Sequence, residues 1–177
     1  MLNVKEGNFD HMGLLFERYN RILFTFFYRM NYQSELSEDL VQNVFFRIMK
    51  YKHAFKGDGE FKTWMFHIAR NVNTDHYRKS KKLGNREDIE QWNERLTDQP
   101  QIDQQEQKDE DLGVLKLAMS KLSDEKREIL NLSKLKGIKY KEIGEMLNCS
   151  EGAVKVKVFR ALYDLKKIYT ETNLQHG

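Results

Sequence analysis

The chain has 177 residues, a length that suits one medium-sized or two small domains. Hydrophobic residues make up 40% and charged residues 32%, and with one proline and 10 glycines this favours an all-helical protein. The longest apolar run, residues 22–28, is far too short to cross a bilayer, and the N-terminus has no signal-peptide pattern. The single cysteine, Cys149, excludes an intramolecular disulfide. We therefore expect an all-α cytoplasmic protein without membrane insertion.

The net charge of +3 hides an uneven distribution along the chain. Residues 86–111 contain ten acidic side chains against three basic ones. Because the whole chain has 30 basic and 27 acidic side chains, 27 bases against 17 acids remain outside this segment. Two basic regions separated by an acidic one indicate a polyanionic partner for the basic regions.

The first predicted helix runs from about Asp10 to about Met30, where aromatic and aliphatic residues recur at helical spacing. So many aromatic residues on one stripe predict a substantial core. A second helix is predicted to begin at Ser37, whose hydroxyl suits an N-cap. The exposed face of this second helix is polar, and this surface is either merely solvated or a docking site for a partner. That face includes Asp39, Gln42 and Asn43.

A short loop with two glycines, residues 56–60, leads into a third predicted helix, Phe61–Lys82. The glycines permit a tight turn or the close approach of a ligand to the backbone. The loop lacks the Lys-Ser/Thr pair and the preceding strand of a phosphate-binding loop, which argues against nucleotide hydrolysis.

The predicted helix Phe61–Lys82 has two distinct faces. One is an apolar stripe that includes Trp64, which suits core packing at least as well as contact with a ligand. The other carries hydrogen-bonding side chains that lead into a basic cluster. A face of this kind suits nucleic-acid bases held beside a phosphate backbone. A solvated face with a basic end placed for the helix dipole fits the residue types equally well. The polar face comprises His67, Asn71, Thr74 and Arg78.

Residues 83–108 lose the helical pattern and are rich in Gln, Glu, Asp and Asn, with the only proline, Pro100. We interpret residues 86–108 as a flexible acidic linker that buries too little apolar surface to fold alone. Its three large apolar side chains form either a short helix or anchor points in a partner. These are Ile89, Trp92 and Leu96.

The last part of the chain, residues 109–177, predicts a helix-turn-helix. Two helices, the second capped by Ser123 and ending at Gly137, precede a short helix over residues 140–147. A turn at residues 148–149 then leads to a long helix capped by Ser150. Its stripe of Val154, Val158, Ala161, Leu162 and Leu165 is predicted to be buried, and its other face is basic. That basic face suits the major groove of DNA, although a plain helical hairpin remains an alternative.

No catalytic, metal or cofactor site is predicted from this sequence. His67, Asn71 and Asp75 share a helix face, but Asn is a poor ligand for a transition metal and the surroundings are cationic. No Ser-His-acid or Cys-His arrangement has the sequence context of nucleophilic catalysis. We therefore expect a protein that is not an enzyme and that needs no cofactor.

Two long stretches resemble a known family. SEDLVQNVFFRIMK (residues 37–50) and FKTWMFHIARNVNTDHYRK (residues 61–79) resemble region two of bacterial sigma factors of the sigma-70 family, and residues 122–167 resemble their region four. With two such regions, a short linker and no third domain, the chain is similar to the extracytoplasmic-function (ECF) group. The resemblance implies region 2 at residues 1–85, the linker at 86–108 and region 4 at 109–177.

The resemblance implies that core RNA polymerase and promoter DNA are the partners, the DNA both as duplex and as melted non-template strand. Many family members also bind an anti-sigma factor. The side chains that would dock on polymerase are Asp39, Gln42 and Asn43. Those that would bind the minus-ten element are Lys56, Gly57, Asp58, Gly59 and Phe61 in the loop, and Asn71, Asp75 and Arg78 on the helix. Those that would bind the minus-thirty-five element are Lys155, Val156, Phe159 and Arg160, with Ser150 and Lys157 on the DNA backbone.

Three hypotheses follow from the sequence. The main one is a sigma factor that binds core RNA polymerase and directs promoter-specific initiation. The second is an autonomous helix-turn-helix regulator with an N-terminal sensing or dimerising domain. The third is a structural helical adaptor, which predicts no salt-dependent affinity for DNA. Val156 stands where the family has a small polar residue, so the sequence that this chain would read is expected to be altered.

Overall fold

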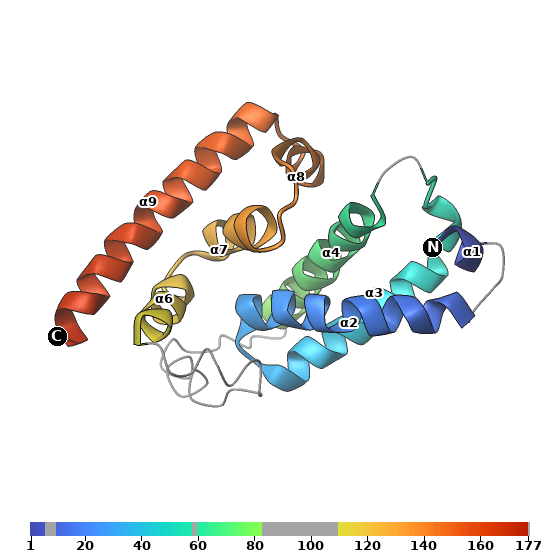
Figure 1. Ribbon diagram of the computed structural model, residues 1–177, viewed down its shortest axis with the longest axis horizontal. Coiled ribbons are helices and arrows are strands. Elements are labelled where there is room, and N and C mark those ends of the chain that lie inside the picture. The colour runs from blue at the N-terminus through green and yellow to red at the C-terminus, as the bar shows by residue number, and fades with distance from the viewer. Residues whose placement is uncertain (6–9, 58–59, 83–109, 177) are drawn as a thin grey trace. The chain divides into compact units, whose positions relative to one another are not determined.

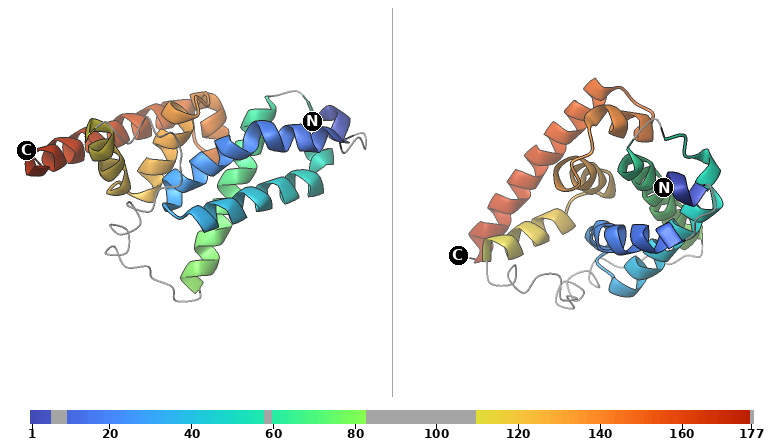
Figure 2. Two further views of the ribbon diagram at one scale, coloured as in Figure 1. Left: turned by 60° about the horizontal axis from the view of Figure 1, so that its bottom comes forward. Right: turned by 45° about the vertical axis from the view of Figure 1, so that its right-hand side comes forward.

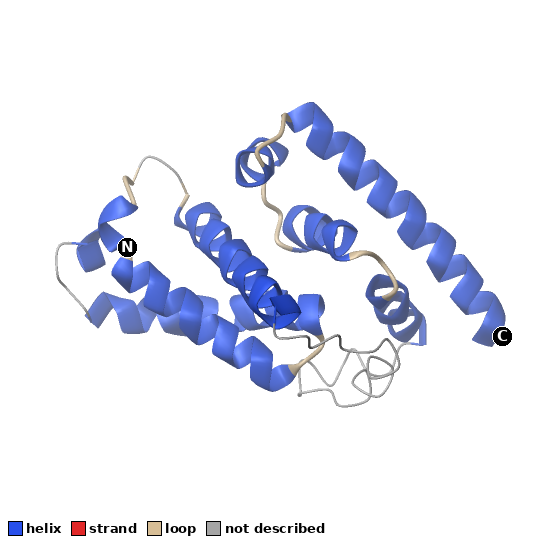
Figure 3. Ribbon diagram, turned by 180° about the vertical axis from the view of Figure 1, so that it is seen from behind, coloured by secondary structure: helices blue, strands red, loops and turns tan. Residues whose placement is uncertain are grey.

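The computed structural model describes residues 1–5, 10–57, 60–82 and 110–176, which form helices and short connections (Figures 1 and 3). The chain divides into two compact units, Met1–Arg95 and Leu96–Gly177. The predictions of an all-α fold and of two small helical domains are therefore confirmed. The predicted acidic linker, residues 86–108, lies outside the described residues, so the domain boundaries remain a prediction.

In unit 1, α3 packs against both α2 and α4, and α1 packs against α2 and against the short 3₁₀ turn η1 (Figure 2). The connection between α2 and α3 has only two residues, whereas ten residues, which include η1, separate α3 from α4. The elements are α1 (Leu2–Lys5), α2 (Asp10–Asn31), α3 (Ser34–Lys50), η1 (Lys52–Ala54) and α4 (Phe61–Lys82).

The core of unit 1 is built around aromatic side chains of α2, as the sequence predicted. Phe26 is fully buried, and its ring centroid lies 5.3 Å from those of Phe27 and Phe66. A buried aromatic side chain contributes roughly 1.5–3 kcal/mol to folding. A polar tie accompanies this packing: Asn31 Nδ2 donates to Asn73 Oδ1 at 3.2 Å, and the Tyr77 hydroxyl donates to Asn31 Oδ1 at 2.9 Å. These contacts connect α2 to α4.

The start of α3 differs from the prediction. The helix begins at Ser34, three residues before the predicted cap at Ser37. Ser37 is fully buried, and its hydroxyl donates to the carbonyl of Gln33 at 2.5 Å instead of capping amides. Only Tyr32 and Gln33 separate α2 from α3, and Tyr32 has a positive φ of 53°. The prediction was wrong because α3 starts almost directly after α2. Hydrophobic spacing alone does not indicate such a short connection.

In unit 2, the long helix α9 packs against α6, α7 and α8 (Figure 1). The helix predicted to end at Gly137 is α-helical to Leu130 and continues as a π-helical turn to Leu135. Gly137 then has a φ of 66°, a value that favours glycine. The elements are α6 (Glu110–Ser120), α7 (Asp124–Leu130), η3 (Asn131–Leu135), α8 (Tyr140–Leu147) and α9 (Glu151–His176).

A buried arginine fixes the corner between α6 and α7. Arg127 is only 2% exposed, and its guanidinium donates to the carbonyls of Met119 at 3.2 Å, Ser120 at 2.9 Å and Leu122 at 2.8 Å. The Met119 and Ser120 carbonyls lie in the last turn of α6, where carbonyls begin to lack helical donors, and the Leu122 carbonyl lies in the turn that follows. Asp124 adds a carboxylate 3.6 Å from the same guanidinium. Arg127 thus caps one helix from within the next.

Candidate nucleic-acid and polymerase interfaces

The connection between α8 and α9 has the close geometry of a helix-turn-helix. Asn148 adopts a left-handed conformation with a φ of 51°, and the amide of Cys149 donates to the carbonyl of Gly144 at 2.9 Å. A Cβ atom on Gly144 would lie 2.6 Å from the carbonyl oxygen of Cys149. Ser150 caps α9, since its Oγ accepts from the amide of Ala153 at 3.1 Å. The predicted turn, the close approach at Gly144 and the cap are confirmed.

Helix α9 buries one face and exposes the other. Val154, Val158 and Ala161 are buried against the rest of unit 2, as predicted. Leu162 is a correction, because it is 39% exposed. It lies at the edge of the buried stripe, about 80° around the helix from Val154, where α9 is no longer covered. The stripe is therefore narrower than its apolar residues predict.

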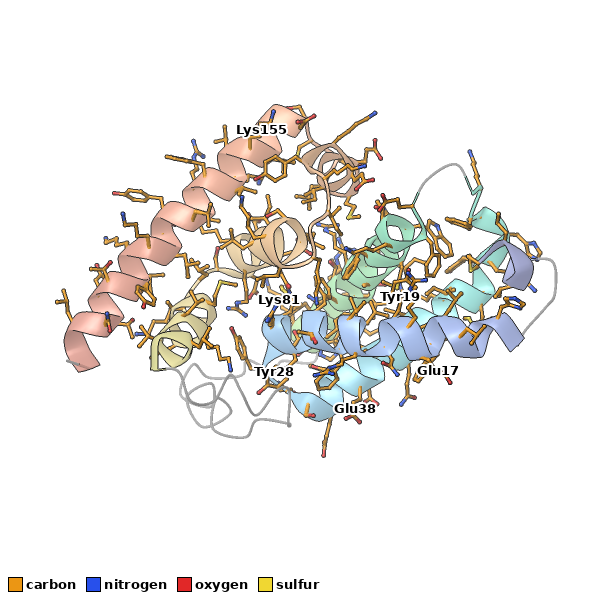
Figure 4. The ribbon with its side chains drawn as sticks, viewed as in Figure 1. Glu17, Tyr19, Tyr28, Glu38, Lys81 and Lys155 are labelled. Carbon is orange, nitrogen blue, oxygen red and sulfur yellow. The ribbon has the colours of Figure 1, made fainter. Side chains whose placement is uncertain are left out.

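The exposed face of α9 contains the side chains that the sequence predicted to read DNA, among them Lys155, which is labelled in Figure 4. Val156 is 48% and Phe159 71% exposed. The Lys155 ammonium lies 3.1 Å from the carboxylate of Glu151, one turn earlier on α9. The two side chains form an ion pair on the surface. Such a pair contributes about 0–1 kcal/mol and breaks readily. The predicted residues of this face are all exposed: Ser150, Lys155, Val156, Lys157, Phe159 and Arg160.

Helix α4 presents part of its predicted polar face to solvent. Asn71 and Arg78 are exposed, and Asn71 Nδ2 lies 3.3 Å from Nδ1 of the exposed His67. Asp75 behaves differently, because its Oδ2 lies 2.8 Å from Nη2 of Arg47 on α3. The structure therefore leaves Asn71 and Arg78 open to a ligand and ties Asp75 to the neighbouring helix.

The loop before α4 rests on an aromatic cluster. The rings of Phe55, Phe61 and Trp64 lie 5.3–6.0 Å apart, and Tyr19 on α2 lies 5.3 Å from Phe61. Trp64, for which the sequence allowed either packing or ligand contact, packs within this cluster and is half-buried. Phe61 is equally half-buried, so each ring retains some exposed surface.

The described part of the loop has an exposed cation and a strained glycine. Lys56 is exposed, and Gly57 has a φ of 84°, which favours glycine. A Cβ on Gly57 would approach Cδ2 of Leu2 to 3.1 Å, so α1 lies against this loop. Asp58 and Gly59, which the sequence also assigned to the loop site, lie outside the described residues.

The third predicted surface lies on α3. Asp39, Gln42 and Asn43 are all exposed, and Glu38 next to them also points away from the helices (Figure 4). Phe46, one turn further along the same helix, is 67% exposed, and the sequence analysis did not single it out. Phe46 follows Asp39 by seven residues, which is two helical turns, so both lie on the same face of α3. This spacing could have identified Phe46 from the sequence.

Arg47 belongs to the polar outer face predicted for this helix, but the sequence does not indicate its role. Its Nε donates to Oδ1 of Asn43 at 3.1 Å, while its Nη2 contacts Asp75. It therefore joins a residue of the α3 surface to a residue of the α4 surface. Arg47 and Asp75 are 28 residues apart in the sequence and lie on different helices. Hydrophobic periodicity therefore gives no signal of their contact.

The described residues contain no group of three or more His, Cys, Asp or Glu side chains that could hold a metal ion. In the part of the chain that the structure describes, no helix combines the length and the apolar character needed to cross a membrane.

Comparisons with known proteins agree with this architecture. A sequence model of sigma-70 region 2 matches residues 15–83, and a model of sigma-70 region 4 matches residues 112–165. The ECF RNA polymerase sigma factor SigM of Bacillus subtilis is 34% identical over 159 residues, which cover 88% of this chain and 93% of SigM. The ECF sigma factor SigW of the same organism is 30% identical, with 93% of this chain and 91% of SigW covered.

Solved structures show the same fold. The sigma factor RpoE of Bartonella quintana, determined in complex with the anti-sigma factor NepR, has a TM-score of 0.71 and 22% identity, over 89% of this chain and 96% of RpoE. CnrH, determined with the cytosolic domain of CnrY, has a TM-score of 0.71 and 20% identity, over 96% of this chain and 94% of CnrH. From the two family regions and the similarity to SigM and SigW, the chain belongs to the ECF RNA polymerase sigma factors, which direct polymerase to promoters.

Proposed function

We propose that this sigma factor grips promoter DNA at two points, with α4 and its preceding loop at the minus-ten element and α9 at the minus-thirty-five element. The observation that carries the proposal is the exposed, cation-rich outer face of α9 immediately after a fixed helix-turn-helix corner. Its counterpart in unit 1 is the exposed Asn71 and Arg78 on α4, about two and four helical turns beyond Trp64 of the aromatic cluster.

At the minus-ten element, unit 1 captures a base that has left the duplex. Extruding a base costs a few kcal/mol, and stacking on an aromatic ring returns about 1–3 kcal/mol. The half-buried rings of Phe61 and Trp64 offer such a platform next to Lys56. Asn71 and Arg78 contact the upstream edge of the element, while Asp75 acts through its ion pair with Arg47. Asp58 and Gly59 are proposed as further contacts with this element.

At the minus-thirty-five element, α9 enters the major groove. Arg160 contacts a guanine edge, a pairing worth about 1–3 kcal/mol of discrimination. Lys157 and Ser150 contact phosphates, which position the helix without reading sequence. Lys155 joins them once the phosphate backbone displaces Glu151 from its ion pair. Phosphate contacts of this kind make the affinity salt-dependent.

Polymerase docks on the exposed polar face of α3. Asp39, Gln42 and Asn43 form the polar contacts, and Phe46 provides an apolar anchor at the end of the same face. Exposed aromatic side chains of this kind are frequent hot spots of protein interfaces. The side chain of Asn43 is held by Arg47, which fixes its orientation before docking.

The protein acts in the cytoplasm and carries out no chemistry of its own, because core polymerase supplies the reaction. An anti-sigma factor is proposed as a further partner, since the structures of both RpoE and CnrH were determined in complex with a second protein and RpoE's partner is an anti-sigma factor. Such a partner would compete with polymerase for the sigma factor. The acidic segment 86–108 is proposed to pass through a positively charged channel of polymerase.

Run-off transcription tests this function directly. We expect promoter-specific transcripts only when the protein and core polymerase are both present, together with weak duplex binding by the protein alone. Tight operator binding without core-dependent initiation would contradict the proposal and favour an autonomous regulator. DNA affinity that does not change with salt concentration would favour a structural adaptor.

A further inference from the structure

The last buried side chain of α4 is polar. Apolar burial on this helix extends from Met65 to Val72, and Asn73, the next residue, is only 4% exposed. Residues 74–82 are all described, and none of their side chains is buried. The half of α4 that carries Arg78 and the lysines after it is therefore not held in place by an apolar core.

A polar tie to α2 begins where the apolar burial ends. Asn31, the last residue of α2, is 4% exposed, and its Nδ2 donates to Oδ1 of Asn73 at 3.2 Å. The hydroxyl of Tyr77, one turn further along α4, donates to Oδ1 of Asn31 at 2.9 Å. The donor and the acceptor of the Asn31 amide thus both bind α4, at two successive turns of that helix.

Such a tie restricts the rotation of a helix more than apolar packing does. Apolar contacts such as that between Phe26 and Phe66 are non-directional, so they tolerate small rotations. A hydrogen bond weakens steeply away from its preferred distance and angle, and a buried amide that loses its partner is costly. In coiled coils a buried asparagine fixes the register of packed helices for the same reason. The contact between Asn31 and Asn73 therefore selects one rotation of α4.

The rotation of α4 decides where its exposed polar side chains point. At 3.6 residues per turn, Asn71 lies about 160° and Arg78 about 140° around the helix from Asn73. Because Asn71 and Arg78 are seven residues apart, they lie within about 20° of each other. Both side chains are exposed. A rotation of α4 about its axis would therefore move both side chains away from the same surface together.

We propose that Asn31 and Asn73 are positioning residues of the minus-ten site, which set the rotation at which α4 presents Asn71 and Arg78 to DNA. Both amides are buried, so they act through these exposed side chains and do not touch DNA themselves. The base preference at the upstream edge of the minus-ten element then depends on a residue of α2. This inference rests on the proposed function, because it requires Asn71 and Arg78 to contact DNA.

A pair of leucines separates positioning from stability. Asn31→Leu alone leaves Oδ1 of Asn73 buried without its donor, which is destabilising, whereas replacing both partners by apolar side chains is close to neutral. We expect Asn31→Leu to lower the midpoint of urea unfolding of the full-length chain. The double variant Asn31→Leu/Asn73→Leu should recover most of this loss. It should not recover the base preference.

Base preference is measured with holoenzyme assembled from the full-length chain and core polymerase. A promoter is selected from a randomised pool, and run-off transcription is compared for all four base pairs at each minus-ten position. In the double leucine variant, the ratio between the best and the worst base pair at the upstream edge should fall by about tenfold, as for one lost hydrogen bond to DNA. Affinity for core polymerase and discrimination at the minus-thirty-five element should keep their wild-type values.

A second measurement shows whether the effect acts through Asn71. Asn71→Ala should reduce transcription by roughly tenfold in the wild-type background and by less than about twofold in the double leucine variant, where the contact is already lost. Val72→Ala is the matched control, because Val72 is buried next to Asn73 and its truncation lowers stability without removing a hydrogen-bonding group. This control should keep the wild-type base preference and the full effect of Asn71→Ala.

Tyr77→Phe tests the same tie by a milder change, since it removes only the hydroxyl that binds Asn31. It should reduce discrimination at the upstream edge by about threefold. It decides the question by itself if the double leucine variant does not fold. Wild-type discrimination in Tyr77→Phe, or in a folded double leucine variant, overturns the inference.

The failure of this inference is distinguishable from that of the proposed function. Additive losses from Asn71→Ala and the leucine pair overturn positioning and leave the function standing, because the buried amides then act independently of Asn71. Wild-type holoenzyme that initiates without any minus-ten base preference contradicts the proposed role of α4. A complete lack of core-dependent initiation contradicts the function itself.

Discussion

Arg47 on α3 holds Asp75 on α4, with Nη2 and Oδ2 2.8 Å apart, and the same guanidinium donates through Nε to Asn43. Asn43 belongs to the proposed polymerase surface and Asp75 to the proposed minus-ten surface. A single planar side chain thus bridges the two surfaces. Because the donors of a guanidinium have a fixed planar arrangement, we expect a change at Asp75 to affect Asn43.

Replacing Arg47 by alanine tests this connection. The ion pair is half exposed, so we expect a loss of stability of no more than about 1 kcal/mol. Open-complex formation should fall more steeply, because the released Asp75 carboxylate then repels DNA phosphates. Arg47→Lys is the matched control, which keeps the charge and loses the two-pronged geometry. Permanganate footprinting of the promoter gives the readout. An open-complex yield equal to wild type in Arg47→Ala would contradict the coupling.

Asn71→Ala should impair opening at the minus-ten element. The exposed amide is proposed to contact DNA at the upstream edge, and the loss of one such hydrogen bond should reduce open-complex formation by roughly tenfold. Transcription is measured on duplex promoters and on the same promoters with a pre-melted minus-ten region. The defect should largely disappear on the pre-melted template. Equal defects on both templates would count against a role in opening.

Arg160→Ala should relax discrimination at one base pair of the minus-thirty-five element by about 1–3 kcal/mol. Its control is Lys157→Ala, which should weaken binding to all sequences alike and reduce the slope of log affinity against log salt by about 1. Holoenzyme binding to promoter variants at several salt concentrations separates the two. If Arg160→Ala weakened binding to all promoter variants equally, Arg160 would not read sequence in the minus-thirty-five element.

Arg127→Ala should destabilise unit 2 by about 3 kcal/mol. The substitution leaves the carbonyls of Met119, Ser120 and Leu122 without their charged donor in a buried corner. Urea unfolding followed by circular dichroism measures the change. Lys126→Ala on the same helix is the control: its pair with Asp164 is partly exposed, so less than about 1 kcal/mol is expected. Similar losses of stability in Arg127→Ala and Lys126→Ala would show that the burial of Arg127 does not contribute to the stability of unit 2.

Gly144→Ala should disturb the helix-turn-helix corner. The added Cβ would lie 2.6 Å from the Cys149 carbonyl oxygen, so the backbone must shift, at about 1–3 kcal/mol. Gly113→Ala is the matched control, because a Cβ there meets no atom within 4 Å, and alanine should stabilise α6 by about 0.5–1 kcal/mol. Urea unfolding of both variants checks the opposite signs. Unchanged stability of Gly144→Ala would contradict the close approach.

The sequence predicted the helices that carry strong local signals. The aromatic stripe of α2, the Ser150 cap and the position of Gly144 all depend on neighbours within a few turns, and the structure confirms them. The start of α3 was predicted wrongly because Ser37 has the residue type of a cap and a buried position that hydrophobic spacing does not indicate. The predicted burial of Leu162 was wrong for a related reason. Periodicity does not show where the neighbouring helices stop covering the apolar stripe of α9.

An ionic contact between two helices of the candidate sites could not be predicted from the sequence. Asp75 was expected to face DNA, and its pairing with Arg47 arises only when α3 packs against α4. The Lys155–Glu151 pair was in principle readable, because the two residues lie four apart on one helix. The exposure of Phe46 followed from the same spacing rule. Contacts within a helix can thus be predicted from sequence, whereas contacts between helices need the fold.

The position of α1 has a practical consequence for anyone who purifies this protein. Val4 is fully buried, and Leu2 lies against Gly57 in the loop that precedes α4. An affinity tag fused in front of Met1 would therefore sit next to the proposed base-capturing loop, and a truncation of the first five residues would remove a support of that loop. Tags for promoter-opening assays belong at the other end of the chain.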